Sequence, residues 1–179
     1  MSRSAGGTNS FTGMRMMELS QDSYEVCELQ WQFYTKAGNQ QMQANLYQKA
    51  QQYYSRAQEL AHLLLEEAQR DRTHPDAIHP YVVSCHNLAD SWLKLDDAQQ
   101  AEMILYQVFN RVSQILTDGD LPNPLRFEAL KALKAVSYEM EHFYRSLDRV
   151  DRAREMFDRA NTVAEKFLAS FDESGMSDS

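Results

Sequence analysis

The sequence repeats itself three times along its length, and this internal repeat limits the chain to a small set of folds. An alanine marks the same place in each copy, as Ala50, Ala101 and Ala153, which are 51 and 52 residues apart. Four residues after each alanine stands a large apolar residue, and three residues later a small one. These residues are Tyr54, Leu105 and Phe157, followed by Ala57, Val108 and Ala160. Positions spaced three, four and seven residues apart share one face of an α-helix, so each copy is predicted to end in a long amphipathic helix.

A second apolar helix precedes the marked one in every copy. Its face includes Tyr34, Ala37 and Gly38 in the first copy, Cys85, Leu88, Ala89 and Trp92 in the second, and Met140, Phe143 and Tyr144 in the third. Only a few residues join the two helices, which forces them to run antiparallel. Asn45, Asp96 and Asp148 stand in this connection and are predicted N-caps, with Gln48 and Gln99 completing capping boxes in the first two copies. The sequence therefore predicts an all-α fold of three tandem antiparallel helix hairpins, about six helices in all.

All four prolines fall in two short stretches, T-H-P-D-A-I-H-P and D-L-P-N-P. Proline removes a backbone donor and clashes with the preceding turn, so these stretches are predicted loops that separate the hairpins. The hairpins are expected over residues 22–70, 81–117 and 124–171, within one repeat domain of residues 22–171. Residues 1–21 are rich in Ser, Gly, Thr and Met and are predicted to be a flexible leader, and residues 172–179 are predicted to be an acidic disordered tail.

Each copy carries two half-motifs at matching spacing. They read Y-x2-A-G from Tyr34 and A-x3-Y-x2-A from Ala50, C-x2-L-A-x2-W from Cys85 and A-x3-L-x2-V from Ala101, and S-x2-M-E-x2-Y from Ser137 and A-x3-F-x2-A from Ala153. Over residues 25–170 this pattern resembles the tetratricopeptide repeat, in which W-x2-L-G-x2-Y precedes A-x3-F-x2-A. The period is longer than the roughly 34 residues of that family, and Glu141 occupies a slot that the family fills with a small residue. The resemblance implies a short solenoid; an ordinary six-helix bundle with coincidental alanines is the alternative.

Composition narrows the classes of partner. The net charge of −8 and the isoelectric point near 5.1 argue against a nucleic-acid partner, since such a protein needs a basic face. No apolar run approaches the roughly 20 residues that span a bilayer, so membrane insertion is not expected. The N-terminal residues lack the apolar core of a secretory signal, and Cys27 and Cys85 match no metal or redox spacing. We therefore predict two reduced thiols and a cytoplasmic protein.

The sequence contains no recognisable catalytic constellation. It has no Gly-rich phosphate loop, no H-E-x-x-H pair and no glycine-flanked nucleophile elbow. His74 and His79, with Asp71 and Asp76, could in principle hold a metal, but histidines in such a loop are more often solvated. We expect no enzyme activity, no catalytic residues, no cofactor and no metal site.

A hairpin array without such chemistry predicts a protein–protein interaction scaffold or adaptor, which binds a protein or peptide segment in a concave groove. A dedicated chaperone of one client, or a regulatory subunit of an enzyme or transcription factor, is the alternative. The resemblance implies that first-helix residues line the groove. Carried over by register, these are Thr35, Asn39, His86, Asp90, Tyr138, His142 and Arg145. Binding on the convex face or at the termini is the competing interpretation, and the two exposed ends of a short array make a homo-dimer a further option.

Overall fold

Six α-helices form three antiparallel hairpins. In the computed structural model the backbone is described over residues 9–175 and the side chains over residues 23–170. The helices are α1 (Asn9–Gln43), α2 (Tyr47–Asp71), α3 (Ile78–Lys94), α4 (Ala98–Thr117), α5 (Asn123–Ser146) and α6 (Val150–Gly175), with a short 3-10 turn, η1 (Pro75–Ala77), before α3. No strand occurs between residues 9 and 175, and the predicted all-α class with three tandem hairpins is confirmed.

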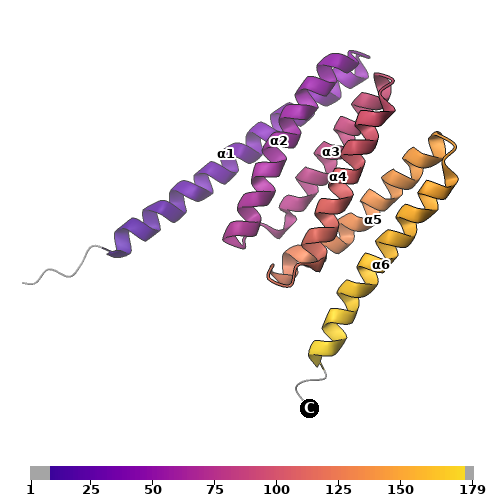
Figure 1. Ribbon diagram of the computed structural model, residues 1–179. Coiled ribbons are helices and arrows are strands. Elements are labelled where there is room, and N and C mark those ends of the chain that lie inside the picture. Colours follow the sequence, from indigo (N-terminus) through magenta and orange to yellow (C-terminus); the bar gives the residue numbers. More distant parts are fainter. Residues whose placement is uncertain (1–8, 176–179) are drawn as a thin grey trace, which may run out of the picture.

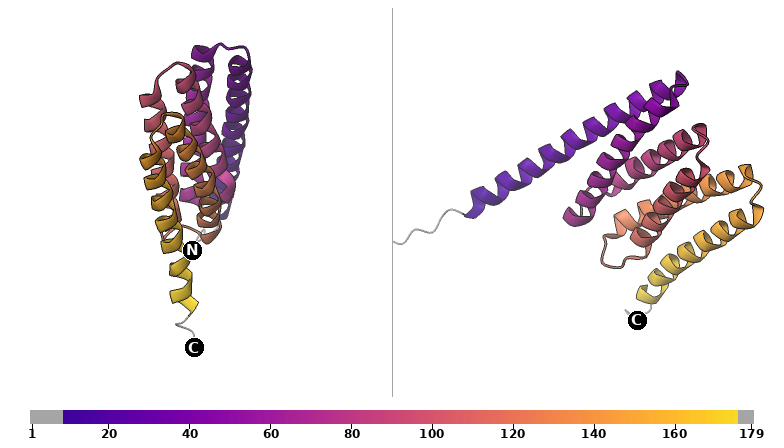
Figure 2. Two further views of the ribbon diagram at one scale, coloured as in Figure 1. Left: turned by 90° about the vertical axis from the view of Figure 1, so that its right-hand side faces the viewer. Right: turned by 45° about the horizontal axis from the view of Figure 1, so that its top comes forward.

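The hairpins stand side by side and form two layers of helices (Figure 1). The first helices, α1, α3 and α5, make one layer, and the second helices, α2, α4 and α6, make the other; the turned views show the same three pairs (Figure 2). Each second helix packs on its own first helix, and two of them also pack on the first helix of the next hairpin, α2 on α3 and α4 on α5. A continuous core runs from α2 to α6. We call the outward surface of α1, α3 and α5 the first-helix face, and that of α2, α4 and α6 the second-helix face.

The turn inside each hairpin has the same backbone conformation. Asn45, Asp96 and Asp148 each have a φ of 58°, in the left-handed region. In the second hairpin the Asp96 amide donates to the Leu93 carbonyl at 3.1 Å, and the next amide donates to the Trp92 carbonyl at 2.9 Å; the other two turns repeat this pattern. Such a pair of bonds around a left-handed residue is the Schellman ending of a helix. The recurrence of this turn is the structural counterpart of the sequence repeat.

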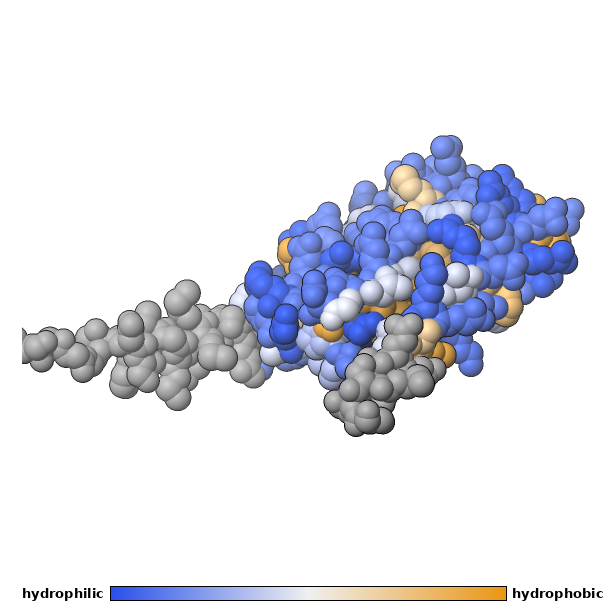
Figure 3. All heavy atoms as spheres, turned by 60° about the horizontal axis from the view of Figure 1, so that its bottom comes forward, coloured by the Kyte–Doolittle hydropathy of each residue, from blue (hydrophilic) through white to orange (hydrophobic). Residues whose placement is uncertain are grey.

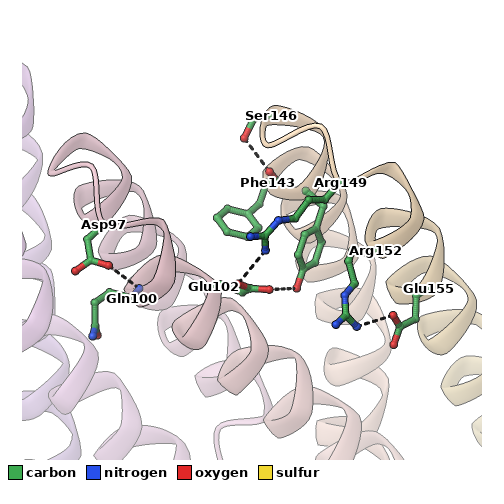
Figure 4. Close-up of polar contacts among 9 residues, drawn as sticks. Asp97, Gln100, Glu102, Phe143, Ser146, Arg149, Arg152 and Glu155 are labelled. Atoms are coloured by element: carbon green, nitrogen blue, oxygen red, sulfur yellow. Dashed lines mark hydrogen bonds and ion pairs between the residues drawn. The ribbon is translucent and has the colours of Figure 1, made fainter.

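The prediction that these three turn residues are N-caps of the second helices is wrong. In the second hairpin the N-cap is Asp97, one residue later, whose carboxylate accepts a hydrogen bond from the Gln100 amide at 3.0 Å (Figure 4). The capping boxes predicted with Gln48 and Gln99 are therefore one residue out of register. Asn and Asp are favoured both at N-caps and in the left-handed region, because a short polar side chain suits both places.

Three helices extend well beyond their predicted ends. The helix α3 begins at Ile78, so Pro80 of a predicted loop lies in its first turn, where proline is tolerated. The leader predicted over residues 1–21 is helical from Asn9 onward, and the tail predicted over residues 172–179 is helical as far as Gly175. The rest of both segments lies outside the described residues. Methionine, glutamate and leucine fill most of residues 14–19 and are good helix formers, so local propensity favours helix there despite the neighbouring Gly and Ser.

Small residues set how closely the helices approach. The three repeat alanines are buried, as the repeat predicts, and Ala101 has no exposed surface. Gly38 meets the ring of Tyr54 so closely that an added Cβ would lie 2.5 Å from two ring carbons. Any larger residue at this helix crossing would force the Tyr54 ring to shift. Glu141 holds the equivalent position of the third hairpin and is only half-buried.

Both cysteines are free thiols. Cys85 is buried, and Cys27 is half-buried with its Sγ 3.6 Å from the Leu60 carbonyl oxygen. Among the helices of the described chain, none combines the length and the apolar character that crossing a membrane requires.

Candidate functional site

Three of the predicted partner-binding residues form a row across the first-helix face. Asn39, Asp90 and His142 stand on α1, α3 and α5, each four residues before the end of its helix, and all three are exposed. Since they occupy equivalent positions, the stacking of the hairpins places them at the same level. Asn39 is also anchored to α2, because its Oδ1 accepts a hydrogen bond from the Tyr54 hydroxyl at 2.7 Å. We call Asn39, Asp90 and His142 the first-helix row.

Two carboxyl groups share one site at this row. Partial desolvation raises the pKa of Asp90, while the charges of Lys94 and His142 act in the opposite direction. Glu139, one turn before His142 on α5, also has a raised pKa, first through desolvation and then through the negative charge of Asp90. Desolvation and the charge of Asp90 raise the pKa of Tyr54 as well. We call Asp90 and Glu139 the acidic pair; together they concentrate negative potential between α3 and α5.

Two other predicted residues, Thr35 and His86, lie between hairpins. The Thr35 Oγ1 and the His86 Nε2 are buried and make no hydrogen bond to any residue that the structure describes. Burial lowers the pKa of His86 to about 4. Both stand at the position equivalent to Tyr138, which is exposed on the last hairpin. The register carried over from the tetratricopeptide pattern places them on an open groove, but in the first two hairpins their polar atoms are buried.

The last two predicted residues, Tyr138 and Arg145, lie at the end of the array. Tyr138 is 65% exposed and lines a hollow of about 310 Å³ between α5 and α6, together with Phe157 and Ala164. Arg145 donates from Nε to Glu141 Oε1 at 2.8 Å and lines a neighbouring hollow that also includes Phe157. The described residues hold no hairpin beyond α6, so this surface is open. We call the outward surface of α5 and α6 around these five residues the terminal surface.

A carboxylate that sequence analysis missed fixes the third hairpin on the second. Glu102 on α4 accepts a hydrogen bond from the Tyr144 hydroxyl on α5 at 2.8 Å, and its other oxygen lies 3.4 Å from an Arg149 guanidinium nitrogen (Figure 4). Tyr144 is buried, and desolvation followed by the bond to Glu102 raises its pKa. One side chain thus holds α5 and the start of α6, and α5 carries Glu139 and His142 of the site.

A wider groove lies between α4 and α6 on the second-helix face, with a volume of about 610 Å³. The Arg159 guanidinium lies 5.2 Å from the centroid of the Phe109 ring at this groove. Asp151, Arg154 and Asp158 also line it, so both signs of charge are present. The charges of this groove offset one another within the chain, as Lys94 and His142 partly offset the charge of Asp90 at the acidic pair.

His74, in the loop before α3, and His79, in the first turn of α3, make separate contacts. His74 stacks on Tyr24 with ring centroids 3.9 Å apart, whereas His79 Nε2 lies 2.8 Å from Glu128 Oε2 on α5. Within the part of the chain whose side chains are described, no three metal-ligating residues gather into a cluster. The first contact joins the loop to α1, and the second joins α3 to α5.

Glu139 could have been found from the sequence. It stands three residues before His142, and the corresponding residues of the first two hairpins are Lys36 and Asn87. Residues three apart are neighbours on a helix surface, so this second row borders the first-helix row. The charge at this position differs between the hairpins, because the residue is a lysine in the first, an asparagine in the second and a glutamate in the third. Only the glutamate of the third hairpin places a carboxyl group next to Asp90.

Exposed large apolar residues occur on all three hairpins, and two sets of three lie at the two ends of the array. The side presented in Figure 3 is predominantly hydrophilic, with hydrophobic residues in small separated patches. At the ends the exposed apolar residues are Val26, Leu29 and Phe33 on α1, and Tyr138, Phe157 and Leu168 on α5 and α6. We call the surface of Val26, Leu29 and Phe33 the leading surface.

A comparison with known protein families identifies the family of this chain. A family model described as Protein of unknown function (DUF2753) matches residues 29–172. The chain belongs to the DUF2753 family. The match runs from α1 to α6 and includes the first-helix row and most of both end surfaces. No curated protein and no solved structure shows a significant match to this DUF2753 chain, and its resemblance to the tetratricopeptide repeat stays a prediction.

Proposed function

We propose that this DUF2753 protein is an interaction module that binds a basic segment of a partner protein across the first-helix row. The observation that carries the proposal is the acidic pair. Asp90 and Glu139 come from different hairpins, on helices α3 and α5 that contact each other, and desolvation followed by the charge of Asp90 raises the pKa of Glu139. Both belong to a rigid framework of packed helices, so the two groups are held together before any partner arrives.

A lysine or arginine side chain is the group that best relieves this arrangement. Carboxylates that lose part of their hydration and repel each other gain when a cation bridges them. An arginine guanidinium offers several donors in a planar fork and can reach two carboxylates at once. A carboxylate ligand, such as a peptide C-terminus, would instead add a third negative charge beside Asp90 and Glu139.

The remaining members of the row suit the backbone of an extended segment. The Asn39 Oδ1 is occupied by the Tyr54 hydroxyl, which leaves the amide nitrogen of Asn39 as a donor for a partner carbonyl. His142, on the other side, offers a ring nitrogen on an exposed face. A segment lying across α1, α3 and α5 would therefore meet a donor at α1 and negative charge between α3 and α5.

The proposal is tested with synthetic peptides of equal length that carry either basic, acidic or only neutral side chains. Binding of each peptide to the full chain is measured by fluorescence anisotropy. We expect the basic peptides to bind, and the variant Asp90→Asn/Glu139→Gln to bind them about tenfold more weakly or worse, since charge-assisted hydrogen bonds are lost. The partner is then captured from cells of the native host with the wild-type chain and with the same variant.

A matched control removes two exposed carboxylates elsewhere, with Asp120→Asn/Glu165→Gln on the α4–α5 loop and on α6. This variant has the same net charge as the test variant, so it separates the local site from the overall acidity. Equal loss of binding in both variants, or tighter binding of acidic peptides, contradicts the proposal.

A further inference from the structure

The terminal surface carries side chains that are buried in the other two hairpins. Phe157 on α6 is 52% exposed, whereas its equivalents Leu105 and Tyr54 are 4% and 3% exposed. Leu168 is 53% exposed, whereas the leucines at the equivalent positions of the first two hairpins are fully buried. In those hairpins the second helix packs on the first helix of the next hairpin. The terminal surface is therefore one half of the hairpin–hairpin interface, left uncovered.

The leading surface is the other half of the same interface. Phe33 on α1 is 64% exposed, but its equivalents Ser84 on α3 and Val136 on α5 are fully buried. Val26 is exposed, while the alanines at its equivalent positions are buried. Ser84 contacts the preceding hairpin directly, because its Oγ accepts a hydrogen bond from the Trp31 indole at 2.8 Å. The leading surface thus holds the positions with which a first helix packs on the hairpin before it.

The two halves also match in charge. His79 on α3 lies 2.8 Å from Glu128 on α5, across the boundary between the second and third hairpins. In the third hairpin the residue equivalent to His79 is Lys131. In the first hairpin the residue equivalent to Glu128 is Glu25. Both residues are exposed, and Lys131 Nζ also lies 2.6 Å from Glu128 Oε1 on its own helix. A cation and an anion therefore stand where a continued stack would bring two side chains together.

The hollow of the terminal surface lies where the Phe33 side chain of a following first hairpin would stand. The Trp31–Ser84 contact joins the first and second hairpins, and moved two hairpins further on it pairs Lys134 on α5 with Phe33 of a first hairpin. Lys134 lines the hollow of about 310 Å³, together with Ala160 and Ala164. A phenylalanine ring needs more room than the serine or valine of the inner hairpins, and the hollow provides it. An ammonium group beside the ring adds a cation–π contact.

We infer that a second copy of this chain docks its leading surface on the terminal surface of the first copy, head to tail, and so continues the stack of hairpins. The occupant is a second copy because both halves of the interface, with complementary charges and a matching knob and hollow, lie on one chain. A head-to-tail contact is heterologous, so it builds a ring or an open fibre depending on the rotation between copies. The contact uses the two ends of the array, away from the first-helix row, and does not depend on the proposed partner binding.

The experiment measures the mass of the full chain by sedimentation velocity, from about 1 to about 200 µM, where mass action makes association visible. The wild-type mass is expected to rise with concentration above the 20.7 kDa of one copy and to pass that of a dimer. Phe33→Asp breaks the leading surface and Phe157→Asp breaks the terminal surface, so each variant alone is expected to stay at 20.7 kDa. An equimolar mixture of the two keeps one intact half on each chain and is expected to give a dimer and nothing larger.

Controls separate this geometry from other forms of association. Leu63→Asp changes an exposed leucine of α2 whose equivalents, Gln114 and Lys166, are polar, and it should leave the wild-type behaviour unchanged. Circular dichroism verifies that each variant folds, and Tyr138→Asp replaces Phe157→Asp if that variant does not. A wild-type chain that stays at 20.7 kDa throughout overturns the inference. So does association that one end variant abolishes and the other leaves intact, because two like ends are then in contact.

Discussion

The second and third hairpins share one backbone plan, but the same positions serve differently in each. In the second hairpin Ala89 and Leu105 are buried where α5 packs on α3 and α4. In the third hairpin the corresponding Glu141 and Phe157 line open hollows. The difference shows that burial in this array depends on the presence of a following hairpin as well as on the position of a residue in its helix.

The largest expected effect tests the difference in burial between the second and third hairpins. It compares the substitutions Leu105→Ala and Phe157→Ala. Leu105→Ala removes buried side-chain volume and is expected to lower the free energy of unfolding by about 2–5 kcal/mol. Phe157→Ala removes a half-exposed ring and is expected to lower it by about 1 kcal/mol or less. Urea denaturation followed by circular dichroism, at a concentration where the chain is monomeric, measures both. Equal losses would mean that the terminal surface is covered within a single chain.

The next effect concerns pH and the covered position of His86. Burial lowers the pKa of His86 to about 4, while an unfolded imidazole takes up its proton near pH 6.5. The unfolded state therefore binds more protons between these values, and stability is expected to fall as the pH drops from 6.5 to 4, by at most about 3 kcal/mol. The variant His86→Thr carries the residue of the first hairpin at this position and should have a flatter pH profile of unfolding free energy.

Asn87→Thr is the control for this experiment, since it changes the neighbouring residue of α3 without removing a titratable group. It should keep the slope of the wild-type protein in the same pH range. If His86→Thr keeps that slope too, the His86 ring is hydrated in the folded protein and the boundary between hairpins is open at this point.

The smallest effects test the turns, which should not depend on a neighbouring hairpin at all. Asp97→Ala removes the side-chain cap of α4 and is expected to cost about 1 kcal/mol. Asp96→Gly and Asp148→Gly relieve a left-handed residue and should each stabilise by a few tenths of a kcal/mol, equally in the second and third hairpins. Thermal melts of the three variants provide the comparison. A loss with Asp96→Gly and no change with Asp97→Ala would restore Asp96 as the N-cap.

The fold could be predicted because its determinants are local and repeated. Ala101 and its two equivalents mark the helix crossings, and a periodicity of three and four residues is set within each helix. The limits of the turns were less predictable, because Asp96 and Asp97 are both acceptable as caps. The contact between Glu102 and Tyr144 joins residues 42 apart in sequence and leaves no local pattern.

The candidate site could be predicted only in part, for a related reason. Register predicts that Asn39, Asp90 and His142 share one row, and all three are exposed. The same register treated Thr35 and His86 as groove residues, although their side-chain polar atoms are buried. Repeat position determines which neighbour a residue faces, but only the number of hairpins determines whether that neighbour exists.

The most direct test of the claim that each hairpin ends in a docking surface for the next is the mass of an equimolar mixture of the Phe33→Asp and Phe157→Asp variants. Each variant alone should sediment as a single copy of 20.7 kDa. The mixture should sediment at twice that mass and no higher at any concentration, because only one intact interface forms per pair. A mixture that remains at the mass of one copy, under conditions where the wild-type chain associates, would contradict the account.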